Sequence, residues 1–242
     1  MNIILLYEND VWLKENVVEI NGSRAQHIHS HLKSNVGDCL RVGLFGGRKG
    51  VGTIELINAS VVRLKVDLTT SPLSRHPFDI ILGLPRPKML RRIFRTCAEY
   101  GVKNIHLINS ARVEKSYWQS PLLNPQKIQE ALLPGLERSR DTIAPQVQLH
   151  KRFRPFVEDS LAPLCAGRPC LIADAEASVA LSEYASSPAM VMIGPEGGFV
   201  PFELQLVQSV LARPVHLGQR ILSVDTALAS VLAVGIARQS IN

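Results

Sequence analysis

A glycine-rich stretch near the end of the chain constrains the fold more than any other part of the sequence. An apolar run at residues 189–193 precedes Gly-Pro-Glu-Gly-Gly at residues 194–198. Pro201 then opens a segment with helical apolar spacing, and Pro201 at the first helical position with Glu203 at the third favours a helix start there. This order predicts a buried strand, a tight loop and a helix. Because open α/β sheets hold ligands in such loops and glycine lets a ligand approach the main chain, residues 194–198 (the glycine loop) are a candidate cofactor site. A purely structural turn would have the same composition.

A second loop follows the next predicted strand, residues 215–217. Residues 217–223 (the second loop) lead into a final helix rich in alanine, leucine and valine, which Ser223 or Asp225 can cap. Taken together, the sequences IGPEGGF at 193–199 and LGQRILSVDTA at 217–227 resemble the RsmE family of 16S rRNA (uridine-N3) methyltransferases, within the SPOUT superfamily.

The resemblance implies a fold, a reaction and partners. The implied fold is α/β, with a SPOUT domain whose parallel sheet ends in a C-terminal trefoil knot, preceded by a small PUA-like β-barrel that binds RNA. The implied reaction is methylation of N3 of a specific uridine in 16S rRNA of the small ribosomal subunit, with S-adenosylmethionine as methyl donor. A homodimer formed across the knot is also implied.

The two loops supply the predicted cofactor site. Main-chain groups at Ile193, Gly194, Leu217 and Gly218 can hold an adenine and a ribose, while Ile221 and Leu222 can form an apolar wall. With the other residues that match the family site, the predicted cofactor-binding set is Ile193, Gly194, Glu196, Gly198, Leu217, Gly218, Ile221 and Leu222.

Arg220 is the predicted catalytic residue. Methylation at N3 of uridine requires loss of an imide proton, and an arginine near O2 or O4 can stabilise the anion that develops. Arg220 lies in the second loop and matches the family's R-I-L sequence. An ion pair between Arg220 and Glu196 is an alternative role, compatible with the first. Ser223 and Asp225 stand where the family has a second arginine and a glutamate.

Positive charge is concentrated in two parts of the chain. Residues 75–115 hold nine Lys or Arg against three Asp or Glu, and residues 138–154 hold five against one, whereas residues 155–242 hold four against eight. A localised basic region favours a polyanionic partner such as RNA. The same distribution separates a candidate RNA surface, residues 75–115 and 138–154, from the net-negative residues 155–242.

One predicted helix carries much of this charge. Apolar residues at helical spacing (Leu90, Ile93, Phe94 and Cys97) should face the core and leave the cations on the opposite face. A solvated surface is the alternative interpretation. The predicted RNA-binding residues of this region are Arg86, Lys88, Arg91, Arg92 and Arg95. The resemblance adds Arg138 and Arg140, in a stretch similar to the family's E-Q-S-x-R sequence but with the arginine one place early.

The sequence predicts two domains, 1–70 and 78–242. Short alternating strands within residues 39–66 indicate a small barrel, and residues 69–77 have the composition of a linker. From Phe78 onward, buried strands predicted at residues 78–84, 104–108, 170–173, 189–193 and 215–217 alternate with helical segments, as in a parallel sheet covered on both faces. Two local features are also expected: a helix capped by Ser23, and an interruption at Pro134 of the helix that begins after Asn124.

Other features exclude several classes of protein. No apolar run approaches the roughly 18 residues of a membrane span, and the first residues do not resemble a secretory signal, so a soluble cytoplasmic protein is expected. The four cysteines and the histidines at positions 27, 29 and 31 lack the spacing of a metal site, so no metal is predicted.

Two alternative functions remain open. A protein with substitutions at positions 223 and 225 could keep the fold as a non-catalytic RNA-binding or ribosome-assembly factor. An α/β enzyme could also use the glycine loop for a phosphorylated metabolite, but the sequence has neither a Walker motif nor a dinucleotide-binding fingerprint.

Overall fold

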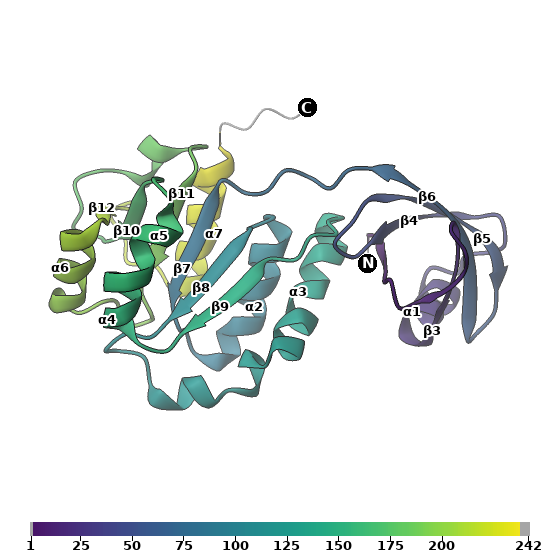
Figure 1. Ribbon diagram of the computed structural model, residues 1–242, viewed down its shortest axis with the longest axis horizontal. Coiled ribbons are helices and arrows are strands. Elements are labelled where there is room, and N and C mark those ends of the chain that lie inside the picture. Colours follow the sequence, from purple (N-terminus) through teal and green to yellow (C-terminus); the bar gives the residue numbers. More distant parts are fainter. Residues whose placement is uncertain (1, 238–242) are drawn as a thin grey trace. The chain divides into compact units, whose positions relative to one another are not determined.

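The computed structural model describes residues 2–237, which form two compact units (Figure 1). The first unit contains the residues up to Ser74 together with Leu133–Ala144. The second contains Arg75–Leu132 together with the residues from Pro145 onward. None of the helices in the described range has both the length and the apolar composition of a membrane span.

The first unit is built on a curved six-stranded sheet. Its order is β1-β4-β5-β6-β3-β2, in which β1 and β4 are parallel and the other neighbours antiparallel. Alternate residues of β6, among them Val62, Leu64 and Val66, are buried in its core. The strands are β1 (Ile4–Leu6), β2 (Val11–Lys14), β3 (Val17–Asn21), β4 (Cys39–Leu44), β5 (Lys49–Ile57) and β6 (Val61–Thr70).

The three strands predicted within residues 39–66 are confirmed as β4, β5 and β6, whereas β1 to β3 were not predicted. The helix expected near Ser23 is present as α1 (Gly22–Gln26) followed by a π-helical turn, His27–His31. The predicted cap was wrong, because Asn21 occupies the N-cap position and Ser23 lies inside the first turn.

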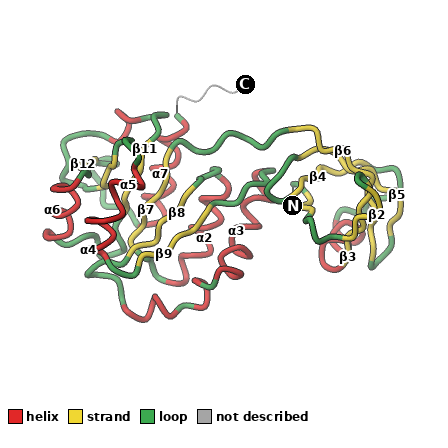
Figure 2. Tube along the Cα trace, in the orientation of Figure 1, coloured by secondary structure: helices red, strands yellow, loops and turns green. Residues whose placement is uncertain are grey.

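The second unit contains a six-stranded parallel sheet of order β12-β10-β11-β7-β8-β9. Figure 2 shows its strands lying between two layers of helix. The strands are β7 (Phe78–Gly83), β8 (Asn104–Ile108), β9 (Gln146–His150), β10 (Cys170–Ala173), β11 (Ala189–Ile193) and β12 (Arg213–Val215). All except β9 were predicted, and β12 begins two residues earlier than expected.

Helices cover both faces of this sheet (Figure 1). Ile81, Ile172 and Met192 pack with Phe156 and Val207 of the α4–α6 layer, and α2 and α7 lie on the other face. The helices of this unit are α2 (Pro87–Glu99), α4 (Phe153–Pro155), α5 (Leu161–Cys165), α6 (Pro201–Val210) and α7 (Val224–Ile236). Helix α3 (Pro125–Ser139) begins in this unit, and its residues from Leu133 onward belong to the first unit.

The interruption predicted in α3 does not occur. Helix α3 begins at Pro125, after Asn124 as expected, but it continues through Pro134 to Ser139. Proline removes one main-chain donor from a helix, so the carbonyl of Glu130 loses its usual partner. Glu130 is exposed, and water can satisfy that carbonyl, which is why the helix tolerates the proline.

A histidine pair, in which His106 is buried and His150 partly exposed, joins β8 and β9 in the second unit. Nδ1 of His106 lies 3.1 Å from Nε2 of His150, and His106 is 2% exposed. Burial, together with the neighbouring His150, lowers the pKa of His106 to about 4. The folded protein therefore holds His106 neutral at pH values where an exposed histidine is protonated.

Acidification should destabilise the protein through His106. Below pH ~6.5 the unfolded chain binds a proton that the folded chain binds only near pH 4. The free energy of unfolding should therefore fall by on the order of 3 kcal/mol across this interval. Urea denaturation of wild type and His106→Leu at several pH values isolates this contribution from that of the carboxylates. Equal pH dependence in the two proteins would contradict it.

Candidate functional site

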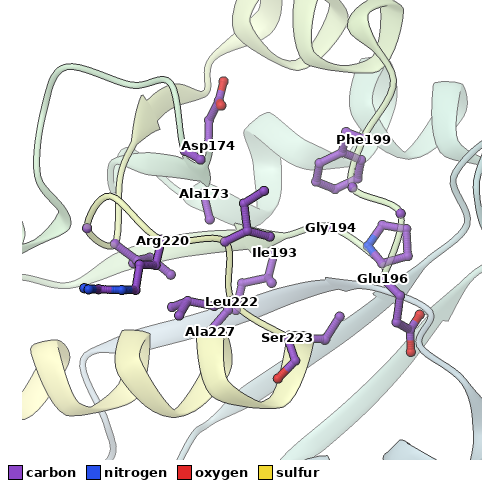
Figure 3. Close-up of a pocket in the computed structure, with 18 of the residues that line it drawn as sticks. Ala173, Asp174, Ile193, Gly194, Glu196, Phe199, Arg220, Leu222, Ser223 and Ala227 are labelled. Carbon is purple, nitrogen blue, oxygen red and sulfur yellow. The ribbon is translucent and has the colours of Figure 1, made fainter.

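Three loops at the carboxyl ends of neighbouring strands surround one cavity of about 700 Å³ (Figure 3). They follow β10, β11 and β12, which are adjacent in the sheet. The lining residues are Ala173, Asp174, Ala175, Ile193, Gly194, Pro195, Glu196, Gly197, Gly198, Phe199, Leu204, Leu217, Gly218, Arg220, Ile221, Leu222, Ser223, Val224 and Ala227. All eight residues predicted to bind the cofactor, and Arg220, therefore lie around the same cavity.

The glycine loop makes a tight turn at the end of β11. The amide of Gly198 donates to the carbonyl of Pro195 at 2.8 Å, and Gly198 has a φ of +71°, which disfavours other residues. A Cβ on Gly194 would lie 3.1 Å from the Cα of Gly198, so the loop closes tightly on itself. The glycines therefore determine the shape of one wall of the cavity.

The glycine loop lies beside the end of β7, where the sheet has its topological switch point. The chain leaves β7 toward β8 on one side and leaves β11 toward β12 on the other. Here Oε1 of Glu196 accepts a hydrogen bond from the amide of Arg86 at 3.0 Å. A crevice at such a switch point is the usual ligand position in an open α/β sheet.

The start of α6 is fixed by a buried carboxylate. Glu203 is 3% exposed, and its Oε2 accepts from the amide of Val200 at 3.0 Å while its Oε1 accepts from the amide of Ala111 at 2.7 Å. The helix start predicted at Pro201 with Glu203 as a capping residue is confirmed. Glu203 also joins the loop after β8 to the end of the glycine loop.

The second loop lines the cavity with Leu217, Gly218 and Leu222. Gly218 has a φ of +114° and its amide donates to Nδ1 of His216 at 3.2 Å. Ile221, predicted as part of an apolar wall, is 93% exposed and lies at the mouth of the cavity. Leu222 and the buried Ile193 are among the apolar residues that line the cavity (Figure 3).

Arg220 is exposed at the rim of the cavity and points away from its centre (Figure 3). The ion pair with Glu196 considered from the sequence is absent among the described residues, and Glu196 lies at the opposite end of the cavity. Within residues 2–237, the guanidinium of Arg220 makes no hydrogen bond or ion pair with the protein. It is therefore available to an incoming ligand.

The start of α7 is linked to α2 through Asp225. Ser223 Oγ donates to Oδ1 of Asp225 at 2.6 Å, and Nη1 of Arg92 donates to Oδ2 at 3.0 Å. The Ser223 hydrogen bond and then the Arg92 contact lower the pKa of Asp225. Ser223 and Asp225, which stand where the RsmE family has an arginine and a glutamate, thus hydrogen-bond to each other.

The predicted core face of α2 is confirmed, because Leu90, Ile93, Phe94 and Cys97 are buried. Two of the cations on the other face have acidic partners, Arg92 with Asp225 and Arg95 with Glu99 at 3.6 Å. The candidate RNA-binding residues of this region, Arg86, Lys88, Arg91, Arg92 and Arg95, are all exposed. Arg138 and Arg140 are also exposed but belong to the other compact unit.

Several residues near the cavity were not predicted to belong to the site. Asp174 follows a correctly predicted strand, and its position at a carboxyl end was the available signal. Arg112 donates a hydrogen bond to the carbonyl of Gly197 from the loop after β8. Nothing in the sequence indicated that contact, because it joins segments far apart in the chain.

No group of three or more His, Cys, Asp or Glu side chains among residues 2–237 is arranged to hold a metal ion. Cys39 is exposed, and Cys97, Cys165 and Cys170 are buried free thiols. Rings of His27 and His31 stack with centroids 5.1 Å apart. Apart from main-chain atoms, the polar groups on the cavity lining are the carboxylates of Asp174 and Glu196, the hydroxyl of Ser223 and the guanidinium of Arg220.

The chain is similar to known RNA-modifying proteins. A family model described as an RNA methyltransferase domain matches residues 72–235. The ribosomal RNA small subunit methyltransferase E of Treponema pallidum is 30% identical over 98% of this chain and 91% of its own length.

Two solved structures share the fold across nearly the whole chain. A ribosomal RNA small subunit methyltransferase E from Neisseria gonorrhoeae, bound to S-adenosylmethionine, has a TM-score of 0.78 and 18% identity over 98% of this chain and 97% of its own. A Legionella pneumophila methyltransferase with bound S-adenosylmethionine has a TM-score of 0.71 and 20% identity, with 98% of each chain covered. The predicted fold class is confirmed, while the knot stays a prediction.

Proposed function

The chain belongs to the RNA methyltransferase family that includes the ribosomal RNA small subunit methyltransferases E, and we propose that it methylates N3 of a specific uridine in 16S rRNA with S-adenosylmethionine as donor. One observation carries the proposal: every residue predicted to bind the cofactor lines a single cavity whose rim bears the exposed Arg220. The cofactor-bound relatives from Neisseria gonorrhoeae and Legionella pneumophila support the choice of donor.

The residues of the cavity fit S-adenosylmethionine. A volume of about 700 Å³ lies within the range of small-molecule sites, and an apolar centre with main-chain polar groups suits an adenosine. Asp174 and Glu196 place negative charge at two positions on the lining, which favours a ligand with a positive sulfonium and an ammonium group. The bound cofactor supplies an electrophilic methyl group.

The protein's contribution to the reaction follows from the placement of Arg220. Uridine releases its imide proton to solvent at the exposed rim as N3 becomes a nucleophile, and negative charge spreads onto O2 and O4. A planar guanidinium with five donors can contact such an oxygen while it remains protonated at all physiological pH values. Arg220 therefore stabilises the uracil anion at the cavity rim, and the apolar residues around Leu222 exclude water from the donor.

The exposed cations of α2 and the preceding turn bind phosphates of the RNA. Phosphate contacts fix the orientation of the RNA without reading its sequence, so they position the target base at the cavity. Arg138 and Arg140, together with the first unit as a PUA-like barrel, extend RNA binding beyond the methyltransferase unit. The macromolecular substrate is the small ribosomal subunit or its 16S rRNA.

Charge reversal at Lys88 and Arg91 should weaken RNA binding. Neither side chain has an acidic partner among the described residues, so Lys88→Glu/Arg91→Glu removes phosphate contacts without breaking an ion pair. Each lost contact lowers the slope of log affinity against log salt by about 0.7 to 0.9. Filter-binding or fluorescence titration at several salt concentrations measures this slope. Lys103→Glu is the control, because Lys103 is exposed and lies just before the amino end of β8, whereas the cavity is at the carboxyl ends of the strands. An equal loss of RNA affinity in both variants would contradict the proposed phosphate contacts of Lys88 and Arg91.

The active form is a homodimer, with the exposed apolar residues of α7 such as Ile236, which is 39% exposed, at or near the contact. The reaction takes place in the cytoplasm, where its ribosomal substrate is assembled. Sedimentation equilibrium of the purified protein distinguishes a dimer from a monomer.

Calorimetric titration with S-adenosylmethionine tests the proposed donor. A saturable heat with one site per chain is expected, and inorganic phosphate or a sugar phosphate should give none. Binding of the phosphorylated compound without S-adenosylmethionine binding would favour a metabolite enzyme. A protein that binds RNA but gives no heat with S-adenosylmethionine would be a non-catalytic member of the family.

A further inference from the structure

Arg112 reaches the glycine loop from the loop that follows β8. Its Nη1 donates a hydrogen bond to the main-chain carbonyl of Gly197. A Cβ built on Gly197 would lie 2.9 Å from Cδ and 3.3 Å from Cβ of Arg112. The side chain of Arg112 thus packs closely against the main chain of Gly197. Arg112 can lie this close because glycine has no side chain at position 197.

The turn that presents Arg112 is itself fixed. The amide of Val113 donates to the carbonyl of Ser110 at 3.0 Å, which closes a turn with Ala111 and Arg112 at its centre. Ala111 is bound to the buried carboxylate of Glu203 at 2.7 Å, and Ser110 is 3% exposed. The backbone of Arg112 is therefore anchored to the start of α6.

Arg112 contacts the glycine loop but does not line the cavity. Gly194, Glu196, Gly197 and Gly198 line the cavity, whereas Arg112 does not. A glycine-rich loop has many accessible conformations, so a contact that holds one carbonyl in place removes conformational freedom that a ligand would otherwise have to remove on binding. The Arg112 contact favours the loop shape that forms the cavity wall.

We propose that Arg112 is a positioning residue that holds residues 194–198 in the conformation that binds S-adenosylmethionine. The inference rests on the proposed function, because it takes S-adenosylmethionine as the ligand of the cavity. Arg112 acts through the carbonyl of Gly197 and does not touch the ligand.

Arg112→Ala should weaken S-adenosylmethionine binding about tenfold, since a hydrogen bond from a charged donor is lost. The melting temperature of the ligand-free protein should stay unchanged, because Arg112 is exposed. Arg112→Lys should restore most of the affinity, because one ammonium donor can reach a single carbonyl. Lys115→Ala, which removes an exposed positive charge from the same segment, is the matched control and should bind like wild type.

A double-mutant cycle with Gly197→Ala makes the test specific. The new methyl group meets the stem of Arg112 at 2.9 Å and should displace it, so Gly197→Ala alone should also weaken binding. In Arg112→Ala the Cδ atom nearest to the new methyl group is absent. Gly197→Ala should therefore reduce the affinity for S-adenosylmethionine less in Arg112→Ala than in the wild-type protein. The two losses are therefore expected to be less than additive.

Calorimetry and thermal melting of these variants test whether Arg112 positions residues 194–198 for S-adenosylmethionine binding. Wild-type affinity in Arg112→Ala, additive losses in the cycle, or a loss of affinity that parallels a fall in melting temperature would each overturn the assignment of Arg112. In all three cases the wild-type protein still binds S-adenosylmethionine and the proposed function stands. Absence of saturable binding by the wild type would instead overturn the proposed function, and this inference with it.

Discussion

Replacement of Arg220 by alanine is expected to lower the rate of methyl transfer by about 10²- to 10³-fold, with unchanged affinity for S-adenosylmethionine. The guanidinium is exposed at the cavity rim and has no protein partner among residues 2–237, so its removal leaves no buried group unsatisfied. Its proposed contact is with the uracil anion, which exists only as the reaction proceeds. The loss should therefore appear in kcat and spare cofactor binding.

Single-turnover methylation of small-subunit RNA and calorimetry on the same variant measure these two effects. Arg220→Lys should recover part of the rate, because a lysine keeps the charge but loses the planar fork of donors. Arg213→Ala, which removes another exposed arginine from the neighbouring β12, is the matched control. An unchanged rate in Arg220→Ala would remove Arg220 from the mechanism.

Gly83→Ala is expected to destabilise the protein by about 3 kcal/mol and to abolish measurable S-adenosylmethionine binding. A Cβ at this position would lie 2.5 Å from Cδ and 2.7 Å from the main-chain nitrogen of Pro195. These atoms belong to the glycine loop and cannot move without moving its backbone. The substitution therefore forces β7 and the cavity wall apart.

Gly47→Ala provides the comparison for the Gly83 variant. The atoms nearest to its Cβ would all belong to the side chain of Leu44, the first at 3.3 Å, and that side chain can adjust. Urea denaturation and calorimetry should show a small change in stability and no change in binding for Gly47→Ala. Wild-type binding by Gly83→Ala would mean that the glycine loop does not form the cofactor site.

The elements of the site could be predicted because their signals are local. An apolar run followed by glycines identified β11 and its loop, and Pro201 with Glu203 identified the start of α6. The apolar spacing of α2 identified its buried face, because a helix places such residues on one side. These properties depend on residues within one or two turns of each other.

The remaining features depend on contacts between distant segments. The order β12-β10-β11-β7 brings two loops separated by the whole of α6 around one cavity, and local patterns carry no information on strand order. Pairing of Arg92 with Asp225 joins residues 133 positions apart, and the contact between Arg112 and Gly197 spans 85. Helix α3 continued through Pro134 because solvent can satisfy the carbonyl that proline leaves unpaired, which depends on exposure and not on sequence.

Mapping of the methylated nucleoside tests directly whether this protein methylates N3 of a uridine in 16S rRNA. Small ribosomal subunits from a strain that lacks this protein are incubated with the purified protein and isotopically labelled S-adenosylmethionine, and the 16S rRNA is digested and analysed by mass spectrometry. Label is expected in 3-methyluridine at a single position of the 16S rRNA. Label in another nucleoside or on a ribose hydroxyl, or no label in a protein that binds both RNA and S-adenosylmethionine, would contradict the proposed function.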